Sequence, residues 1–198
     1  DEWIVRDQGA MVRQIGYSPE EFAYITIEKE GGFDKAKQTL DKSELKPSNY
    51  HPIPAKINSA GEKYSKILNK IFTNDYDFKD YDRATNIYWP GNKLGHGRED
   101  VIKFWNSLKS ILSDIKFKIE HVGYLDEPNR NPRASIRWSL EGIHSKDSKD
   151  YGKKTNSNLS FIGINHAELN PYGVIKEWVL FDEVAIWKQI LINKNKNG

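Results

Sequence analysis

The feature that most constrains the fold is a series of four strand-like runs in the second half of the chain, with no helical pattern between them. The runs are IKFKIEHVGYL, RASIRWSLEGIH, LSFIGINHAEL and VIKEWVLF, at residues 115–125, 133–144, 159–169 and 174–181. Segments rich in turn-forming residues separate them. Because strands joined in this way pair antiparallel, the sequence predicts an antiparallel sheet.

Helical patterns flank these strands. Apolar residues form one stripe from about Arg98 to Leu112, and Glu99 and Asp100 complement the positive end of that helix. A second helical pattern begins near Ala60, and a short one follows the last strand. The stretch ATNIYWPG, which lies between the helix near Ala60 and the helix that begins near Arg98, predicts one more strand. The fold class is therefore α+β, with helices packed on one face of a strongly curved, mostly antiparallel sheet.

The composition divides the chain into four segments. Residues 1–30 predict a helical arm, because Ser18, Pro19 and Glu21 form the capping box of a helix. Residues 31–58 are rich in Lys, Asp, Ser, Asn and Pro and predict a linker. Residues 59–192 hold the strand and core-helix signals, so we expect them to fold without the arm. Residues 193–198 predict a disordered tail.

Charge and composition exclude several classes of function. Thirty Lys and Arg residues against 28 Asp and Glu leave a net charge of +2 with both signs interspersed, so we expect no nucleic-acid partner. No apolar run approaches the ~20 residues of a membrane span. The absence of Cys excludes disulfides and thiolate chemistry and suits a reducing compartment, so we expect a cytoplasmic protein. The first residue is Asp1, which leaves a processed or truncated chain open.

Three stretches carry a resemblance to a known family. They are RWSLEGIH at 137–144, GINHAEL at 163–169 and IKEWVLFDEVAIWKQIL at 175–191. From Tyr81 to Leu191 the chain resembles the SnoaL-like, polyketide cyclase-related branch of the nuclear transport factor 2-like superfamily. The resemblance implies a conical α+β barrel with a pocket between sheet and helices. The opening DEWIVRDQGAMVRQIGYSPEEFA resembles the connector between two copies of this domain, which implies the C-terminal half of a tandem protein.

Asp182 is the leading candidate for chemistry. The resemblance to SnoaL-like cyclases implies that Asp182 is the general acid/base of an intramolecular aldol closure, the role of the Asp at the matching position in those enzymes. That role needs a carboxylate in an apolar cavity, where desolvation raises its pKa towards neutrality, and Trp178 and Leu180 are apolar neighbours. The alternative is structural, because Asp182 precedes a helix and Asp is a favoured N-cap.

Three histidines are further candidates. His144 ends the inward-facing row of its strand and could position a substrate oxygen or act as the partner base of Asp182. It could equally be a buried His held by hydrogen bonds alone. His166 and His121 are weaker candidates for ligand binding, since a bulge would turn them to the other face. The three lie on separate strands without ligand spacing, so we expect no metal site and no cofactor.

Four aromatic residues could line a pocket for a flat ligand. They are Tyr88, Trp105, Trp138 and Trp178. Each could instead belong to the hydrophobic core, which is the usual place for aromatic stripes.

The last strand is apolar on both faces. Ile175, Val179 and Phe181 share one parity, and we expect them to lie on the outer face of the sheet. An exposed apolar stripe of this kind predicts a homodimer, or packing on a tandem copy of the domain.

Two functions follow from these candidates. The first is a small-molecule pocket protein, such as a cofactor-independent cyclase, isomerase or hydrolase that acts on an apolar or aromatic cyclic compound through Asp182 and His144. The second is a non-catalytic domain of the same fold that binds a ligand or mediates association. An open cavity with Asp182 at its floor would favour the first. A cavity filled by Trp138, Trp178 and Trp105 would favour the second.

Overall fold

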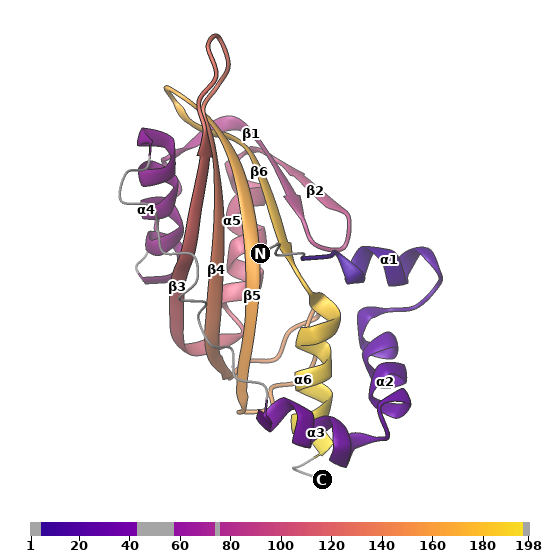
Figure 1. The fold of residues 1–198 in the computed structure, drawn as a ribbon. Coiled ribbons are helices and arrows are strands. Elements are labelled where there is room, and N and C mark those ends of the chain that lie inside the picture. Colours follow the sequence, from indigo (N-terminus) through magenta and orange to yellow (C-terminus); the bar gives the residue numbers. More distant parts are fainter. Residues whose placement is uncertain (1–4, 43–57, 74–75, 196–198) are drawn as a thin grey trace.

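The computed structural model describes residues 5–42, 58–73 and 76–195, which form six helices and six strands (Figure 1). The helices are α1 (Gln8–Gln14), α2 (Pro19–Lys29), α3 (Phe33–Lys42), α4 (Ser59–Thr73), α5 (Gly97–Lys109) and α6 (Glu183–Asn195). The strands are β1 (Tyr81–Trp89), β2 (Lys93–His96), β3 (Leu112–Leu125), β4 (Arg133–His144), β5 (Asn158–Asn170) and β6 (Gly173–Phe181).

The strands form one curved sheet in the order β2-β1-β6-β5-β4-β3. All neighbours pair antiparallel except β1 and β6, which are parallel. The α+β class and the mostly antiparallel sheet are thus confirmed. The sheet does not close into a barrel, because β2 and β3 remain its two edges.

The core lies between the sheet and the helices α4 and α5. Strand β4 alternates as the sequence predicts, since its inward row from Ala134 to His144 is buried at every second position. From α5, Val101, Trp105 and Leu108 pack into the same core. We call this side of the sheet the inner face and the opposite side the outer face.

The predicted orientation of β6 is wrong. Val179 and Phe181 are buried in the core and not on the outer face. Trp178 lies on the outer face and is 39% exposed, and Leu180 shares its parity and is half-buried. The error has a physical cause: both parities of this strand are apolar, so alternation alone cannot select the buried face.

The arm packs against the rest of the chain. The capping box at Ser18 is present, with Glu21 N donating to Ser18 Oγ at 3.1 Å. Helices α2 and α3 both pack on α6, in part through a small cluster of Ile27, Ala36 and Ile192 (Figure 1). Helix α6 is therefore enclosed between the sheet and the arm.

Three segments differ from the sequence prediction. Residues 33–42 of the predicted linker form α3, because Phe33, Ala36 and Leu40 recur at helical spacing and pack towards Ile192. The rest of that linker lies outside the described residues. Strand β2 occupies a Gly-rich stretch whose composition indicates a loop. Helix α6 continues to Asn195, so the predicted tail is helical over 193–195, and 196–198 lie outside the described residues.

Among the described residues, no helix is both long enough and apolar enough to cross a membrane.

Candidate functional site

The space between sheet and helices, where the resemblance implies a pocket, is filled by side chains. Trp105 and Trp138 have no exposed surface, and neither do Tyr64 and Tyr81. The rings of Phe72 and Trp105 meet edge to face with centroids 5.5 Å apart. The sequence left open whether the interior holds an open cavity or is filled by tryptophans, and it is filled at Trp105 and Trp138.

A buried carboxylate lies at the centre of this interior. Glu177 on β6 is fully buried, and its Oε1 accepts hydrogen bonds from Tyr64 Oη at 2.5 Å, Tyr81 Oη at 3.0 Å and Asn165 Nδ2 at 3.1 Å. Its Oε2 accepts from Trp105 Nε1 at 3.3 Å. Two further bonds extend the network: Trp138 Nε1 donates to Asn165 Oδ1, and Asn165 Nδ2 donates to Tyr64 Oη, both at 2.7 Å. We call this group the Glu177 network.

Burial dominates the electrostatics of this network. Desolvation raises the pKa of Glu177 to about 7, although its four hydrogen-bond donors act in the opposite direction. Burial next to this carboxylate also raises the pKa of both tyrosines well above the ordinary value. The described residues place no Lys or Arg against Glu177. A carboxyl group with such a pKa can hold or release a proton near neutral pH, but it is closed off from solvent.

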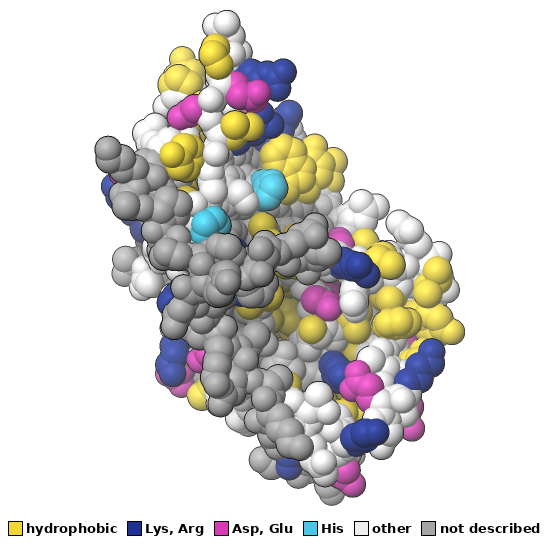
Figure 2. Space-filling model, viewed as in Figure 1, with side chains coloured by type: hydrophobic (Ala, Val, Ile, Leu, Met, Phe, Trp, Pro, Cys, Tyr) yellow, Lys and Arg dark blue, Asp and Glu magenta, His cyan; other side chains and the backbone are white. Residues whose placement is uncertain are grey.

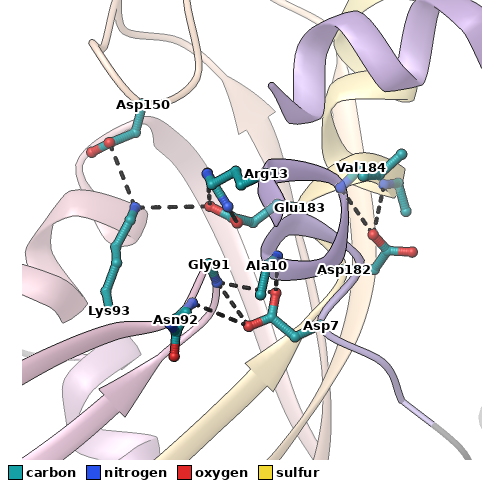
Figure 3. Close-up of polar contacts among 11 residues, drawn as sticks. Asp7, Ala10, Arg13, Gly91, Asn92, Lys93, Asp150, Asp182, Glu183 and Val184 are labelled. Carbon is teal, nitrogen blue, oxygen red and sulfur yellow. Dashed lines mark hydrogen bonds and ion pairs between the residues drawn. The ribbon is translucent and has the colours of Figure 1, made fainter. Parts of the chain in front are cut away.

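Asp182 caps helix α6. Its Oδ1 accepts from Val184 N at 2.9 Å and Ala185 N at 3.2 Å, so the predicted N-cap is present (Figure 3). Its Oδ2 takes no part in the cap. Asp182 also lines a hollow of about 510 Å³, which we call the Asp182 hollow; its wall includes Val5, Gln8, Ser160, Ile162 and Ala185. Burial raises the pKa of Asp182, while the two capping amides lower it.

His144 does not share a site with Asp182. His144 ends β4 on the inner side, Asp182 follows β6, and β5 separates these strands. The positions opposite them on β5 are about five residues apart, roughly 16 Å of strand. His144 is fully buried, its Nδ1 lies 3.4 Å from Thr155 Oγ1, and desolvation lowers its pKa. No described residue offers a hydrogen-bond partner to its Nε2.

A second hollow lies on the outer face of the sheet. This outer groove has a volume of about 840 Å³ and is lined mainly by side chains of β3 to β6, among them Tyr124, Ser135, Ile164, His166, Trp178 and Leu180. Figure 2, which has the same viewpoint as Figure 1, shows hydrophobic side chains gathered beside histidine on this face. Apolar surface therefore surrounds a few polar groups here.

The register of the sheet aligns part of the outer groove. Ser135, His166 and Trp178 line the groove at directly paired positions, and Tyr88, which does not line it, is the next paired position beside Trp178. The rings of Trp178 and Tyr88 stack with centroids 5.4 Å apart and an angle of 7° between their planes. His166 is exposed, and partial desolvation lowers its pKa, which favours the neutral imidazole.

The predicted site residues thus fall into separate places. Trp105, Trp138 and His144 lie in the interior, whereas His166, Trp178 and Tyr88 meet on the outer face. His121 lies on β3 opposite Arg137, near the outer groove but not among its lining residues.

Sequence reasoning missed the Glu177 network. Its six members come from six elements, and no spacing in the sequence joins them. The one available signal was Glu177 itself, a charged residue inside an otherwise apolar strand.

No cluster of three or more His, Cys, Asp or Glu suited to a metal ion occurs among the described residues.

Comparisons with known proteins identify the fold. No family model and no curated protein matches the sequence. Solved structures do match, at low sequence identity. A candidate SnoaL-like polyketide cyclase from Jannaschia sp. CCS1 is 12% identical, with 67% of this chain and 94% of that chain covered and a TM-score of 0.52. One from Shewanella putrefaciens CN-32 is 13% identical, with coverage of 69% and 88% and a TM-score of 0.54.

A third similar structure is IdmH, a candidate polyketide cyclase from Streptomyces antibioticus. It is 12% identical, with 67% of this chain and 99% of that chain covered and a TM-score of 0.53. Identities this low establish architecture and not activity. At the level of fold the resemblance in the sequence is confirmed: the chain has the SnoaL-like form of the nuclear transport factor 2-like fold.

Proposed function

We propose that this chain is a small-molecule binding protein that holds a flat, uncharged apolar or aromatic molecule in the outer groove. The observation that carries the proposal is the contrast between the two faces of the sheet. The inner face is filled around the Glu177 network, whereas the outer face has a groove of about 840 Å³. Volumes of ~300–1,000 Å³ are typical of small-molecule sites.

The lining chemistry supports an uncharged ring as the ligand. Trp178, already stacked on Tyr88, offers a rigid aromatic surface, and Ile164 and Leu180 extend it with aliphatic contacts. His166 supplies a mainly neutral imidazole that can donate or accept one hydrogen bond.

The proposal predicts that Trp178 contributes much of the affinity. Trp178→Ala is expected to weaken binding of the uncharged probe N-phenylnaphthylamine by about tenfold, since a lost stacking surface is worth ~1 kcal/mol or more. Fluorescence titration of the full chain measures the effect. Leu94→Ala is the matched control, because Leu94 is 64% exposed on β2 and does not line the groove. Equal affinities for the Trp178 and Leu94 variants would refute the proposed site.

A second candidate function is proton transfer by Asp182. Its support is specific: Asp182 lines the Asp182 hollow, its Oδ2 lies outside the cap, and burial raises its pKa. In this reaction the carboxylate would remove a proton from a carbon next to a carbonyl group. The enolate would then recover a proton from the carboxylic acid. The predicted partner His144 is too distant to take part.

Asp182→Asn separates catalysis from capping, because Asn caps a helix about as well as Asp but cannot accept the proton. If the candidate is right, the chain catalyses deuterium exchange next to the carbonyl of 2-tetralone, an aromatic cyclic ketone, and the variant slows it by roughly two to four powers of ten. NMR in deuterium oxide follows the exchange. Unfolding of the variant should be nearly unchanged. Full exchange activity in the Asn variant would leave Asp182 only its capping role.

A further inference from the structure

Helix α1 is held to the rest of the chain by few apolar contacts. Its buried residues are Gly9 and Val12, whereas Met11 is 58% exposed and Ile15, just after the helix, is 65% exposed. By contrast, α2 buries Pro19, Ala23 and Ile27. The first helix therefore depends on other contacts for its position.

One of those contacts is a carboxylate clamp on the β1–β2 turn. The two oxygens of Asp7 accept from Gly91 N at 3.0 and 2.9 Å, and Oδ2 lies 3.4 Å from Asn92 N. Asp7 Oδ1 also accepts from Ala10 N at 2.8 Å and so caps α1 (Figure 3). The residue that starts the helix is thus also the residue that attaches it.

The second contact is an ion pair with the first residue of α6. Arg13 donates to both oxygens of Glu183, at 2.6 and 3.3 Å, and the Glu183 side chain is only 5% exposed. Lys93 also approaches Glu183, at 3.8 Å (Figure 3). The fit is close, since a Cβ at Gly9 would collide with Glu183. Without Arg13, Lys93 would be the one cation that the described residues leave near this buried carboxylate, and its distance of 3.8 Å makes the arrangement costly.

Gly16 connects this polar attachment to the firmly packed helices. Its φ of +90° lies in the region that favours glycine, and no atom lies within 4 Å of a Cβ built there. A rotation at this position would move α1 while α2 keeps its own packing on α6. The segment just before α1 faces the candidate sites, because Val5 lines both the outer groove and the Asp182 hollow and Gln8 lines the hollow.

We propose that residues 5–15 form a strap, hinged at Gly16, that covers one side of the Asp182 hollow while Asp7 and Arg13 hold it down. Release of these two polar contacts uncovers more of the hollow. The strap deepens the second candidate function, because it would admit a substrate to Asp182, and only its purpose rests on that function. Its test needs no ligand, so failure of either proposal can be recognised without the other.

Thiol labelling of the full chain tests the strap, because the natural sequence has no Cys. Ile162→Cys places one thiol in the wall of the Asp182 hollow. Labelling by Ellman's reagent is expected to accelerate on the order of tenfold when Arg13→Ala is added, the equivalent of ~1.4 kcal/mol of opening free energy. Added NaCl should accelerate labelling with Arg13 present and have less effect without it. Asp7→Ala gives a second, independent release.

Two controls make the result decisive. Arg130→Ala removes an exposed arginine that pairs with Glu127 at 3.5 Å on the β3–β4 hairpin, and it should leave the rate unchanged. Ala60→Cys places a thiol on the buried side of α4, where general unfolding is needed to expose it. Equal rates with and without Arg13→Ala in a folded protein would overturn the strap. So would equal acceleration of the Ile162 and Ala60 thiols.

Discussion

Phe181→Ala is expected to lower the free energy of unfolding by about 3–5 kcal/mol, whereas Leu180→Ala next to it should cost only about 1 kcal/mol or less. Phe181 is fully buried on the inner face, with Trp89 and Phe161 rings 5.4 and 5.7 Å away, so truncation leaves a cavity. Leu180 lines the open outer groove, where water can fill the space.

Urea denaturation of the two variants measures the difference, which is the most direct test of which face of β6 is buried. Val179→Ala should resemble Phe181→Ala in sign, because Val179 is 3% exposed in the same core. A larger loss at Leu180 than at Phe181 would reverse the orientation of the strand.

Glu177 is expected to make stability depend on pH. Its folded-state pKa of about 7 lies above the ordinary value of 4.5. Below pH 4.5 both states bind the proton, and the folded state loses nothing. As the pH rises through 7, the folded state must give up a proton that the unfolded chain has already released. Stability should therefore fall by about 2–3 kcal/mol between pH 5 and pH 8 through this one group.

A comparison with Glu177→Gln isolates that contribution. Other groups titrate in the same range, including His144 and His166, so the quantity of interest is the difference between parent and variant. The loss of unfolding free energy between pH 5 and pH 8 should be about 2–3 kcal/mol smaller in Glu177→Gln than in the parent protein. An identical slope in both proteins would mean that Glu177 does not titrate in this window.

Local patterns predicted much of the fold. The stripe of α5, the alternation of β4 and the capping box at Ser18 each depend on neighbouring residues, and each is found in the structure. The cap formed by Asp182 is local in the same way. These features need no knowledge of distant contacts.

The errors concern contacts between distant segments. Strand β6 has apolar residues on both faces, so alternation alone does not select the buried one. A charged residue such as Glu177 suggests a solvent-facing position. It is buried because Tyr64, Tyr81 and Asn165 donate hydrogen bonds to its carboxylate. Helix α3 has apolar residues at helical spacing, but its charged composition obscures them, and Ile192, on which they pack, lies far along the chain. The separation of His144 from Asp182 is likewise set by sheet order, which no short pattern encodes.

The enclosure of α6 between sheet and arm has a consequence for the order of folding during synthesis. Helices α2 and α3 leave the ribosome roughly 150 residues before the helix that covers them. Until α6 emerges, Ile27 and Ala36 cannot pack on Ile192. The strands can pair with one another before the arm docks. The arm can therefore complete its docking only as a late event, joined by contacts of very high sequence separation. A nascent chain interrupted before α6 would expose the apolar side of the arm and the end of the sheet together.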